Sequence, residues 1–229
     1  MVMLERMWNI MDKKTSKNWD KIRIITQLLF LGVFVLLFLT KRLQLWIVIF
    51  GAGVLVSVFF SRFYCGWVCP IGTIMRFQTW VYKLFHINRL KTPEFIKSSI
   101  YKWLLLTAFI VLMLMTRMMN LKINIILYVV AAGVLISLFF EEAFWHKYLC
   151  PYGTILNITS RKARLKLQIN ESKCISCGLC QKECINNCIV TLENKKRSIE
   201  NKDCIMCHKC QVVCSTGAII YKKQENNIT

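Results

Sequence analysis

Long runs of apolar residues dominate the first two thirds of the chain. They cover Ile22–Thr40, Leu43–Phe60, Ser99–Met118 and Ile123–Phe140. Each run is close to the ~20 residues that an α-helix needs to cross the hydrocarbon core of a bilayer. Only a few residues separate the first run from the second, and the third from the fourth. The pattern therefore predicts a membrane all-α domain of four transmembrane helices, arranged as two helical hairpins.

The pattern changes near residue 160, where short alternating segments replace the long apolar runs. Four of these segments predict the strands of a small α+β unit: Leu165–Ile169, Ile189–Leu192, Ser198–Glu200 and Ile219–Lys222. Most of the cysteines also lie in this part of the chain. The change in composition predicts three parts, which are an N-terminal segment (1–21), a membrane domain (22–160) and a small C-terminal domain (161–229).

Basic residues indicate how the membrane domain is oriented. The chain of 229 residues is 55% hydrophobic and carries a formal charge of +19. Lys and Arg are concentrated in the N-terminal segment, in the loop between the second and third spans, and in the tail. Because cytoplasmic loops are enriched in these residues, we expect a multi-pass protein of the cytoplasmic membrane with both termini in the cytoplasm. A chain this apolar is not expected to bind nucleic acid.

The two hairpins are copies of one another. Residues 52–60 match residues 132–140, and a Cys-Pro turn follows each copy, at Cys69-Pro70 and at Cys150-Pro151. Both copies enter from the same side, so the repeats are expected to be parallel, with an axis along the membrane normal. Gly53 with Ser57, and Gly133 with Ser137, are small-x-x-x-small pairs that are expected to allow close helix packing.

The loop between the hairpins contains an amphipathic pattern. Its apolar residues recur at helical spacing, and polar or basic residues occupy the other side. A basic helix rich in aromatic residues suits the cytoplasmic membrane interface. It could instead pack as a cap over the helical bundle. The apolar positions are Ile74, Phe77, Trp80, Val81, Leu84 and Phe85.

Eight cysteines of the C-terminal domain form two copies of a C-x2-C-x2-C-x3-C pattern. This spacing lets one tight loop supply several thiolates to the corners of a [4Fe–4S] cube. Zinc sites typically use two C-x2-C pairs, and disulfides need an oxidising compartment, so both alternatives fit less well. The copies are Cys174, Cys177, Cys180 and Cys184, and then Cys204, Cys207, Cys210 and Cys214.

This segment, about residues 164–223, resembles a bacterial-type two-cluster ferredoxin. In such proteins the fourth cysteine of each run ligates the other cluster. The resemblance implies a first cluster on Cys174, Cys177, Cys180 and Cys214, and a second on Cys204, Cys207, Cys210 and Cys184. Cys188 aligns with Ala218 in the other half and is expected to pack near a cluster, or to serve as a spare ligand. His208 is expected to be solvated, or to tune a cluster potential.

A second group of cysteines lies at the Cys-Pro turns. Cys65 and Cys69 are four residues apart, and in the second repeat His146 and Cys150 take their places. Residues four apart share one face of a helix. If the repeats face each other, three sulfurs and one imidazole converge at the cytoplasmic boundary and could hold iron, an iron–sulfur centre, copper or zinc. Alternatively, these cysteines are small buried residues beside a tight turn.

Taken together, residues 22–223 resemble the polyferredoxin-type family of membrane 4Fe–4S proteins. That family includes the quinol-dehydrogenase membrane subunit of periplasmic nitrate reductase, the regulatory membrane protein of nitrous-oxide reduction and the cupric reductase of oxidase assembly. Its motif cysteines correspond to Cys65, Cys69 and Cys150, while His146 departs from the pattern. The resemblance implies a subunit that relays electrons between a quinol pool or cytoplasmic donor and a membrane or extracytoplasmic reductase partner, with quinone as a candidate ligand.

Two other functions stay open. One is a metal-ion (cupric) reductase that uses Cys65, Cys69, Cys150 and His146 as its substrate site; the other is a redox-sensing or assembly factor without turnover. Histidines and ionised residues are missing from the centres of the spans. A transmembrane haem with two histidine ligands and a buried proton relay are therefore not expected. Neither G-x-G-x-x-G nor a P-loop occurs in the sequence, so no hydride or group-transfer chemistry is expected.

Overall fold

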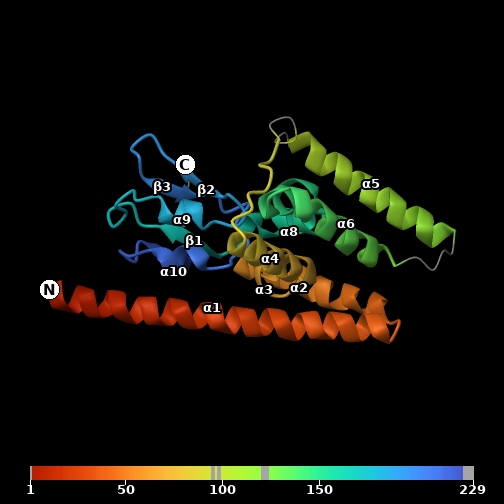
Figure 1. Cartoon of the computed structure of the whole chain (residues 1–229), viewed down its shortest axis with the longest axis horizontal. Coiled ribbons are helices and arrows are strands. Elements are labelled where there is room, and N and C mark those ends of the chain that lie inside the picture. The colour runs from red at the N-terminus through yellow and green to blue at the C-terminus, as the bar shows by residue number, and fades with distance from the viewer. Residues whose placement is uncertain (1, 94–95, 97–98, 120–123, 224–229) are drawn as a thin grey trace.

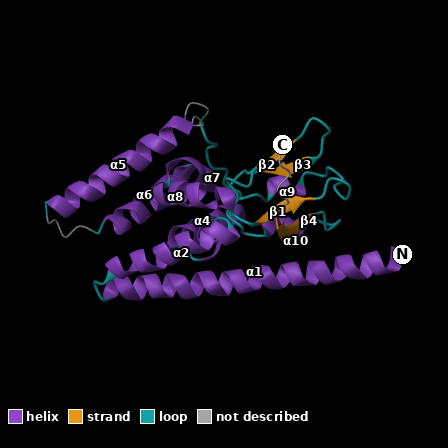
Figure 2. Cartoon of the chain, turned by 180° about the vertical axis from the view of Figure 1, so that it is seen from behind, coloured by secondary structure: helices purple, strands orange, loops and turns teal. Residues whose placement is uncertain are grey.

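The computed structural model describes residues 2–93, 96, 99–119 and 124–223. A single long helix, α1 (Val2–Leu39), lies along the molecule and contacts both its helical part and its C-terminal domain (Figure 1). A tight turn leads into η1 (Leu43–Leu45) and α2 (Trp46–Phe60), and the ring of Trp46 at the start of α2 packs 5.2 Å from that of Phe34 on α1. Seen from behind, the strands all lie at the end of the molecule that holds the N-terminus (Figure 2).

The helices of the membrane domain include three that are long and apolar enough to cross a bilayer. They cover Asn18–Leu39, Leu43–Phe60 and Ile100–Met118, close to the first three predicted spans. The third belongs to α5 (Ser99–Met118). The fourth predicted span corresponds to α6 (Ile125–Phe139), an apolar helix of 15 residues, and its predicted start at residue 123 lies outside the described residues. The count of four spans therefore stays a prediction.

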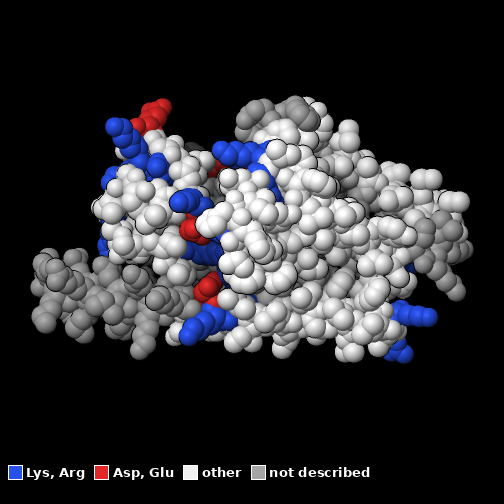
Figure 3. Space-filling view, viewed as in Figure 1, with Lys and Arg blue, Asp and Glu red and all other residues white. Residues whose placement is uncertain are grey.

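The surface is consistent with a membrane-embedded part. On the face shown in Figure 3, charged side chains gather over the junction with the C-terminal domain, and most of the helical part is free of them. Many apolar side chains of α2 and α5 point outward, such as Leu55, Ile100 and Leu104. Lipid tails would cover these side chains, because an apolar helix surface is stable in a bilayer and costly in water.

Each Cys-Pro turn starts a helix. In the first repeat α3 (Phe63–Trp67) leads to α4 (Pro70–Leu84), and in the second α7 (Glu142–Phe144) and the π-helix η3 (Trp145–Leu149) lead to α8 (Pro151–Thr159). Proline is favoured at the first helical position because its missing N–H would have no partner there. Cys69 and Cys150 precede the prolines in extended conformations, with ψ of 119° and 114°, as expected for residues before proline.

The two Cys-Pro turns are closed by the same kind of hydrogen bond. The amide of Cys150 bonds the carbonyl oxygen of Trp145 at 2.9 Å, and the amide of Cys69 bonds that of Tyr64 at 3.0 Å. Both bonds join residues five apart, as in a π-helix. The second repeat has one residue more than the first between its Phe-Phe pair and its Cys-Pro turn, and this residue lies before Trp145.

Each repeat packs against the other through equivalent helices. Ser57 of α2 bonds Thr159 of α8 through their hydroxyl oxygens, 2.6 Å apart, and Ser137 of α6 bonds Gln78 of α4. Thr159 and Gln78 occupy matching positions after the two Cys-Pro turns. The second helix of each hairpin thus packs on the helix that follows the turn of the other repeat.

The glycines of the two small-residue pairs each face an aromatic ring. A Cβ added at Gly53 would come 2.6 Å from the ring of Tyr64, and one at Gly133 would come 2.8 Å from the ring of Trp145. Gly53 and Gly133 are equivalent in the repeat, and so are Tyr64 and Trp145. The glycines therefore accommodate the segment that leads into each Cys-Pro turn.

The amphipathic pattern between the hairpins forms α4, as predicted. Met75, Ile71 and Thr73 are buried against the rest of the helical domain, whereas Phe77 and Trp80 are 64% and 59% exposed. The aromatic face of α4 consequently points outward. Of the two readings of this segment, the arrangement favours a helix at the membrane interface over a cap on the bundle.

The C-terminal domain contains two small antiparallel sheets. After η4 (Ser160–Lys162), β1 (Leu165–Ile169) pairs with β4 (Ile219–Lys223), and β2 (Ile189–Thr191) pairs with β3 (Arg197–Ile199). The strands lie where the sequence predicts them, within one residue at most ends. Two short helices, α9 (Leu179–Lys182) and α10 (Lys209–Val213), follow the cysteine loops. The core combines aliphatic side chains with cysteines, namely Leu167, Ile189, Ile199, Met206, Ile219, Cys188, Cys204 and Cys210.

Candidate functional site

The two cysteine runs of the C-terminal domain have the same backbone conformation. Ser176 and Gly178 in the first run, and Met206 and His208 in the second, all have φ between 53° and 77°. This left-handed region is uncommon for residues other than glycine. Its recurrence at matching positions curls both loops tightly, and each loop then enters a short helix that carries the third cysteine of its run.

The pKa shifts of Cys180 and Cys210 indicate which cysteines lie near each of them. Burial and the negative charges of Cys214, Cys174 and Cys177 raise the pKa of Cys180. Burial and the charges of Cys207, Cys204 and Cys184 are the largest causes of the raised pKa of Cys210. Cys180 thus has Cys214 of the second run near it, and Cys210 has Cys184 of the first run near it. The assignment of the two ligand sets stays a prediction.

The twelve cysteines are all free thiols. Among the described residues, no group of three or more His, Cys, Asp or Glu side chains has the arrangement of a single metal-ion site. A [4Fe–4S] cube does not need that arrangement, because each of its irons bonds one cysteine. The assignment of two [4Fe–4S] clusters to these cysteines stays a prediction.

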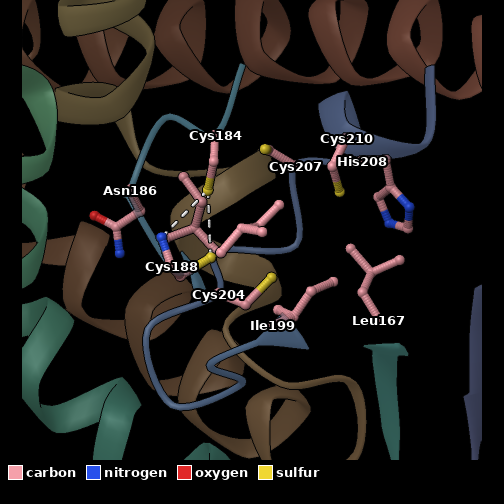
Figure 4. Close-up of a pocket in the computed structure, with 11 residues that line it drawn as sticks. Leu167, Cys184, Asn186, Cys188, Ile199, Cys204, Cys207, His208 and Cys210 are labelled. Carbon is pink, nitrogen blue, oxygen red and sulfur yellow. Dashed lines mark hydrogen bonds between the residues drawn. The ribbon is translucent and has the colours of Figure 1, made fainter. Parts of the chain in front are cut away.

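Cys188 lies between two cysteines assigned to the second cluster (Figure 4). Its sulfur is 3.4 Å from that of Cys184, and it also forms a side-chain hydrogen bond with Cys204. The hydrogen bond from Cys188 is the largest cause of the lowered pKa of Cys184, which is about 6. It is also the largest cause of the lowered pKa of Cys204. Cys188 thus has a single S–H between two predicted ligand sulfurs and can donate it to one of them at a time. The sequence did not predict this contact, although the mismatch with Ala218 could have signalled it.

The three cysteines of the Cys-Pro turns share one buried cluster of side chains. Burial and then the charges of Cys65 and Cys150 raise the pKa of Cys69. Burial and then the charge of Cys65 raise the pKa of Cys150 to about 12. Cys69 and Cys150 are therefore both electrostatic neighbours of Cys65, and their raised pKa values favour the protonated thiol at these two positions.

His146, the fourth predicted member of this site, is buried and faces the first repeat. A Cβ added at Gly72 would lie 3.7 Å from both Cε1 and Nε2 of the ring and 3.2 Å from the carbonyl oxygen of Cys65. Nε2 of His146 lies 3.6 Å from a carboxylate oxygen of Glu142 and has no hydrogen-bond partner among the described residues. The imidazole therefore lies beside the first Cys-Pro turn and has a carboxylate beside its Nε2 nitrogen.

The first Cys-Pro turn is in direct contact with the loop assigned to the second cluster. Nε1 of Trp67 donates a 2.9 Å hydrogen bond to the carbonyl oxygen of Met206. A Cβ added at Gly66 would come 2.1 Å from the carbonyl oxygen of Ile205, so only glycine fits there. Arg23 of α1 donates to the carbonyl oxygen of Cys207. These contacts hold the cluster-binding loop against the membrane domain.

His208 of the same loop is buried and is not solvated. Its Nδ1 lies 2.6 Å from the side-chain oxygen of Gln211, and its ring packs near those of Trp19, Trp67 and Tyr221. Burial lowers the pKa of His208. The imidazole therefore belongs to the packed interface between the loop and the membrane domain.

A cavity of about 680 Å³ opens on the other side of the Cys-Pro turns, between helices α2, α5, α6 and α8. Its walls are mainly apolar, and they include Tyr64, Cys69 and Tyr152. The ring of Phe50 lies 5.4 Å from that of Tyr64 and 4.9 Å from that of Tyr152. Burial raises the pKa of both phenols, so each keeps its proton and can donate a hydrogen bond.

Comparison with known families supports an iron–sulfur protein. The profile of a 4Fe–4S binding domain matches twice, at residues 42–91 and 124–170, once over each predicted repeat. A second 4Fe–4S binding domain profile matches residues 167–190, which contain the first cysteine run.

Several curated proteins are similar to this chain. An uncharacterized protein of Methanocaldococcus jannaschii, MJ0749, is 32% identical over 132 residues, which cover 54% of this chain and 51% of that protein. The putative electron transport protein YccM of Escherichia coli is 26% identical over 58% of this chain and 44% of its own length. The ferredoxin-type protein NapH of Haemophilus influenzae is 26% identical over 58% of this chain and 52% of its length.

These matches leave much of each relative unaligned. The chain spans about half the length of the curated relatives that it matches. No solved structure matches the chain.

Proposed function

The chain belongs to the polyferredoxin-type family of 4Fe–4S electron-transfer proteins, and on this premise we propose that it relays electrons between a membrane quinol and a redox partner protein. The eight cysteines of the C-terminal domain would hold two clusters in the crossed sets given above. When bound, the clusters supply two one-electron carriers, which matches the two electrons released when one quinol is oxidised. The N-terminal segment and the C-terminal domain lie on the cytoplasmic side in this proposal.

The observation that carries the proposal is the 680 Å³ cavity beside Cys69. Pockets of about 300–1,000 Å³ with mainly apolar walls and a few polar groups are typical of small-molecule sites. The protonated phenols of Tyr64 and Tyr152 suit the oxygen atoms of a quinol or quinone ring. Tyr64 is fixed by Trp46, whose Nε1 donates a 2.8 Å hydrogen bond to the phenol oxygen.

The position of the cavity supports the same function. Cys69 lines it, and Trp67, in the same turn, bonds the loop that carries Cys204 and Cys207. A quinol in the cavity would therefore be separated from the second cluster only by the Cys-Pro turn. The arrangement provides a short path from the interior of the membrane domain to the cytoplasmic domain.

The test mixes the anaerobically purified protein rapidly with a short-chain quinol. The loss of iron–sulfur absorbance reports the rate at which the clusters are reduced. A Gly51→Phe variant narrows the cavity, because Gly51 lines it and has open space at its Cβ position. Gly32→Phe is the matched control, since Gly32 also has open space but does not line the cavity. We expect Gly51→Phe to slow reduction by quinol, whereas Gly32→Phe and the parent react alike.

Dithionite reduces the clusters without using the quinol site, so it shows whether a variant has lost its clusters. Reduction by dithionite should be the same in the parent, Gly51→Phe and Gly32→Phe. Equal quinol reduction in all three proteins would contradict the quinol site. A parent protein that quinol does not reduce, but that binds a partner tightly, would instead indicate a sensing or assembly factor.

A second candidate function is reduction of a metal ion, for which copper is the leading substrate. It is favoured by the shared burial of Cys65, Cys69 and Cys150, because thiolates are soft ligands that suit Cu(I). The test is the metal content of the parent beside a Cys65→Ser/Cys69→Ser/Cys150→Ser variant. Copper that the parent binds and reduces, and that the variant loses, would favour this function; equal metal contents would contradict it.

A further inference from the structure

A second cavity, of about 140 Å³, lies where α5, η3 and α8 meet the C-terminal domain. We call it the cationic pocket, because five of the residues that line it are Lys or Arg. They come from five separate places in the chain. These residues are Arg62, Lys102, Lys147, Arg161 and Lys202.

The charges of the cationic pocket are not balanced. Asp203 is buried and forms ion pairs with Arg62 at 3.9 Å, Lys102 at 3.7 Å and Lys147 at 3.3 Å. Lys147 also pairs with Glu200 at 3.5 Å. Arg161 and Lys202 form no ion pair with another described residue. Five cations thus share two carboxylates, which leaves a surplus of positive charge around the cavity.

Arg62 is a second observation that points to an anion in the cationic pocket. Its side chain is 1% exposed, and its Nε has no hydrogen-bond partner among the described residues. Its Nη atoms make long contacts, at 3.4 Å with the carbonyl oxygens of Lys202 and His146 and at 3.9 Å with a carboxylate oxygen of Asp203. A buried charged donor without an acceptor is costly, so such groups normally have a partner. A small anion in the pocket would supply the acceptor.

The shape of the pocket also suits an anion. Its volume is below the ~300 Å³ of the smallest typical pockets for drug-sized ligands, so it fits a single small group. Gly153 and Thr154 from the first turn of α8 line it, and helix N-termini attract negative charge. A Cβ at Gly153 would come 2.8 Å from an Nη atom of Arg62, so the glycine allows the guanidinium to approach.

The location indicates where the anion comes from. Lys102 and Trp103 line the pocket and lie in the first turns of α5, whose candidate span begins at Ile100. Tryptophan is enriched at the level of the lipid headgroups. Basic pockets between membrane helices on the cytoplasmic side are suited to anionic headgroups.

We propose that the cationic pocket binds a phosphate group, supplied by the headgroup of an anionic phospholipid or by free phosphate. The bound group connects α5 and α8 with Lys202 of the C-terminal domain. It therefore fastens the cluster-binding domain to the membrane domain. The proposal is independent of the quinol site, since no residue lines both cavities.

The experiment measures lipid binding to the delipidated, anaerobically purified full chain by native mass spectrometry. The probes are phosphatidylglycerol, phosphatidylcholine and inorganic phosphate alone. The pocket variant is Arg161→Gln/Lys202→Gln, which removes two charges that have no ion pair among the described residues. The control is Lys83→Gln/Lys91→Gln, which removes two charges of the same sign from exposed positions outside the pocket.

We expect the delipidated parent and the control each to bind one phosphatidylglycerol molecule more tightly than phosphatidylcholine. The pocket variant should bind it about thirtyfold more weakly, from roughly 1 kcal/mol for each basic residue. Binding of inorganic phosphate that the same variant loses, without lipid preference, would identify free phosphate as the source. Equal weakening in the pocket variant and the control, or no binding of either probe, would overturn the proposal. Lys102→Gln serves as a second pocket variant if the first does not fold.

Discussion

Nε1 of Trp67 and the carbonyl oxygen of Met206 are joined by a 2.9 Å hydrogen bond between the first Cys-Pro turn and the loop of the second cysteine run. Both residues are buried, at 3% and 1% exposure. The bond crosses between two parts of the chain that the sequence places far apart. It is one of several hydrogen bonds that link the membrane domain to the proposed cluster-binding domain.

Replacing Trp67 with Phe should weaken this link. The variant keeps an aromatic ring but leaves the carbonyl oxygen of Met206 without its donor, which costs about 1–3 kcal/mol in a buried site. We expect the temperature at which the iron–sulfur absorbance disappears to fall. Trp80→Phe is the control, because Trp80 is 59% exposed. An equal effect of both substitutions would contradict the role given to Trp67.

Replacing Gly133 with Ala should disturb the second repeat. Its new Cβ would come 2.8 Å from the ring of Trp145, and overpacking of this kind costs about 1–3 kcal/mol. Gly51→Ala is the matched control on α2, since nothing lies within 4 Å of that Cβ position. Thermal unfolding in detergent should separate the two variants, and a Gly133→Ala protein as stable as the parent would contradict the packing described here.

Replacing Cys188 with Ala should lower the reduction potential of the second cluster alone. Hydrogen bonds to ligand sulfurs stabilise the more negative, reduced state of a cluster. Loss of one such bond corresponds to a shift on the order of 40 mV. Redox titration followed by electron paramagnetic resonance would show the shift. Cys188→Ser, which keeps a donor, should shift the potential less, and a changed first cluster with an unchanged second would contradict the assignment.

The crossed ligand sets predict a specific asymmetry between two variants. In a background that lacks Cys204, Cys207 and Cys210, only the first cluster should form. Adding Cys214→Ser should then alter the spectrum of that cluster, whereas adding Cys184→Ser should leave it unchanged. The reverse pattern would show that each run ligates its own cluster.

The positions of the cysteine loops and of the strands could be predicted from the sequence because both depend on local patterns. The strands at Leu165–Ile169 and Ile219–Lys223 flank the cysteine loops and lie where the sequence predicts them. Their antiparallel pairing was not predicted from the sequence. The first three spans follow from hydropathy alone. The Cys-Pro turns are equally local, since proline fixes both its own conformation and that of the preceding cysteine.

Other features depend on which distant residues meet, and a sequence does not state that. The small-residue pairs predicted close helix packing, but it is the rings of Tyr64 and Trp145 that face Gly53 and Gly133. The hydrogen bonding of Cys188 with Cys184 and Cys204 depends on how β2 folds back over the cysteine loop. The cationic pocket joins Arg62, Lys102 and Lys202, which are separated by long stretches of chain. The sequence of α4 was compatible with a helix at the membrane interface and with a cap over the bundle. The exposure of its aromatic side chains favours the membrane interface.

The most direct test of the central claim is the iron and acid-labile sulfide content of the anaerobically purified chain. Two [4Fe–4S] clusters predict about eight irons and about eight sulfides per chain. Removing Cys174, Cys177 and Cys180 together should reduce both to about half. A parent protein that contains about four irons or fewer, or zinc in place of iron, would contradict the two-cluster relay.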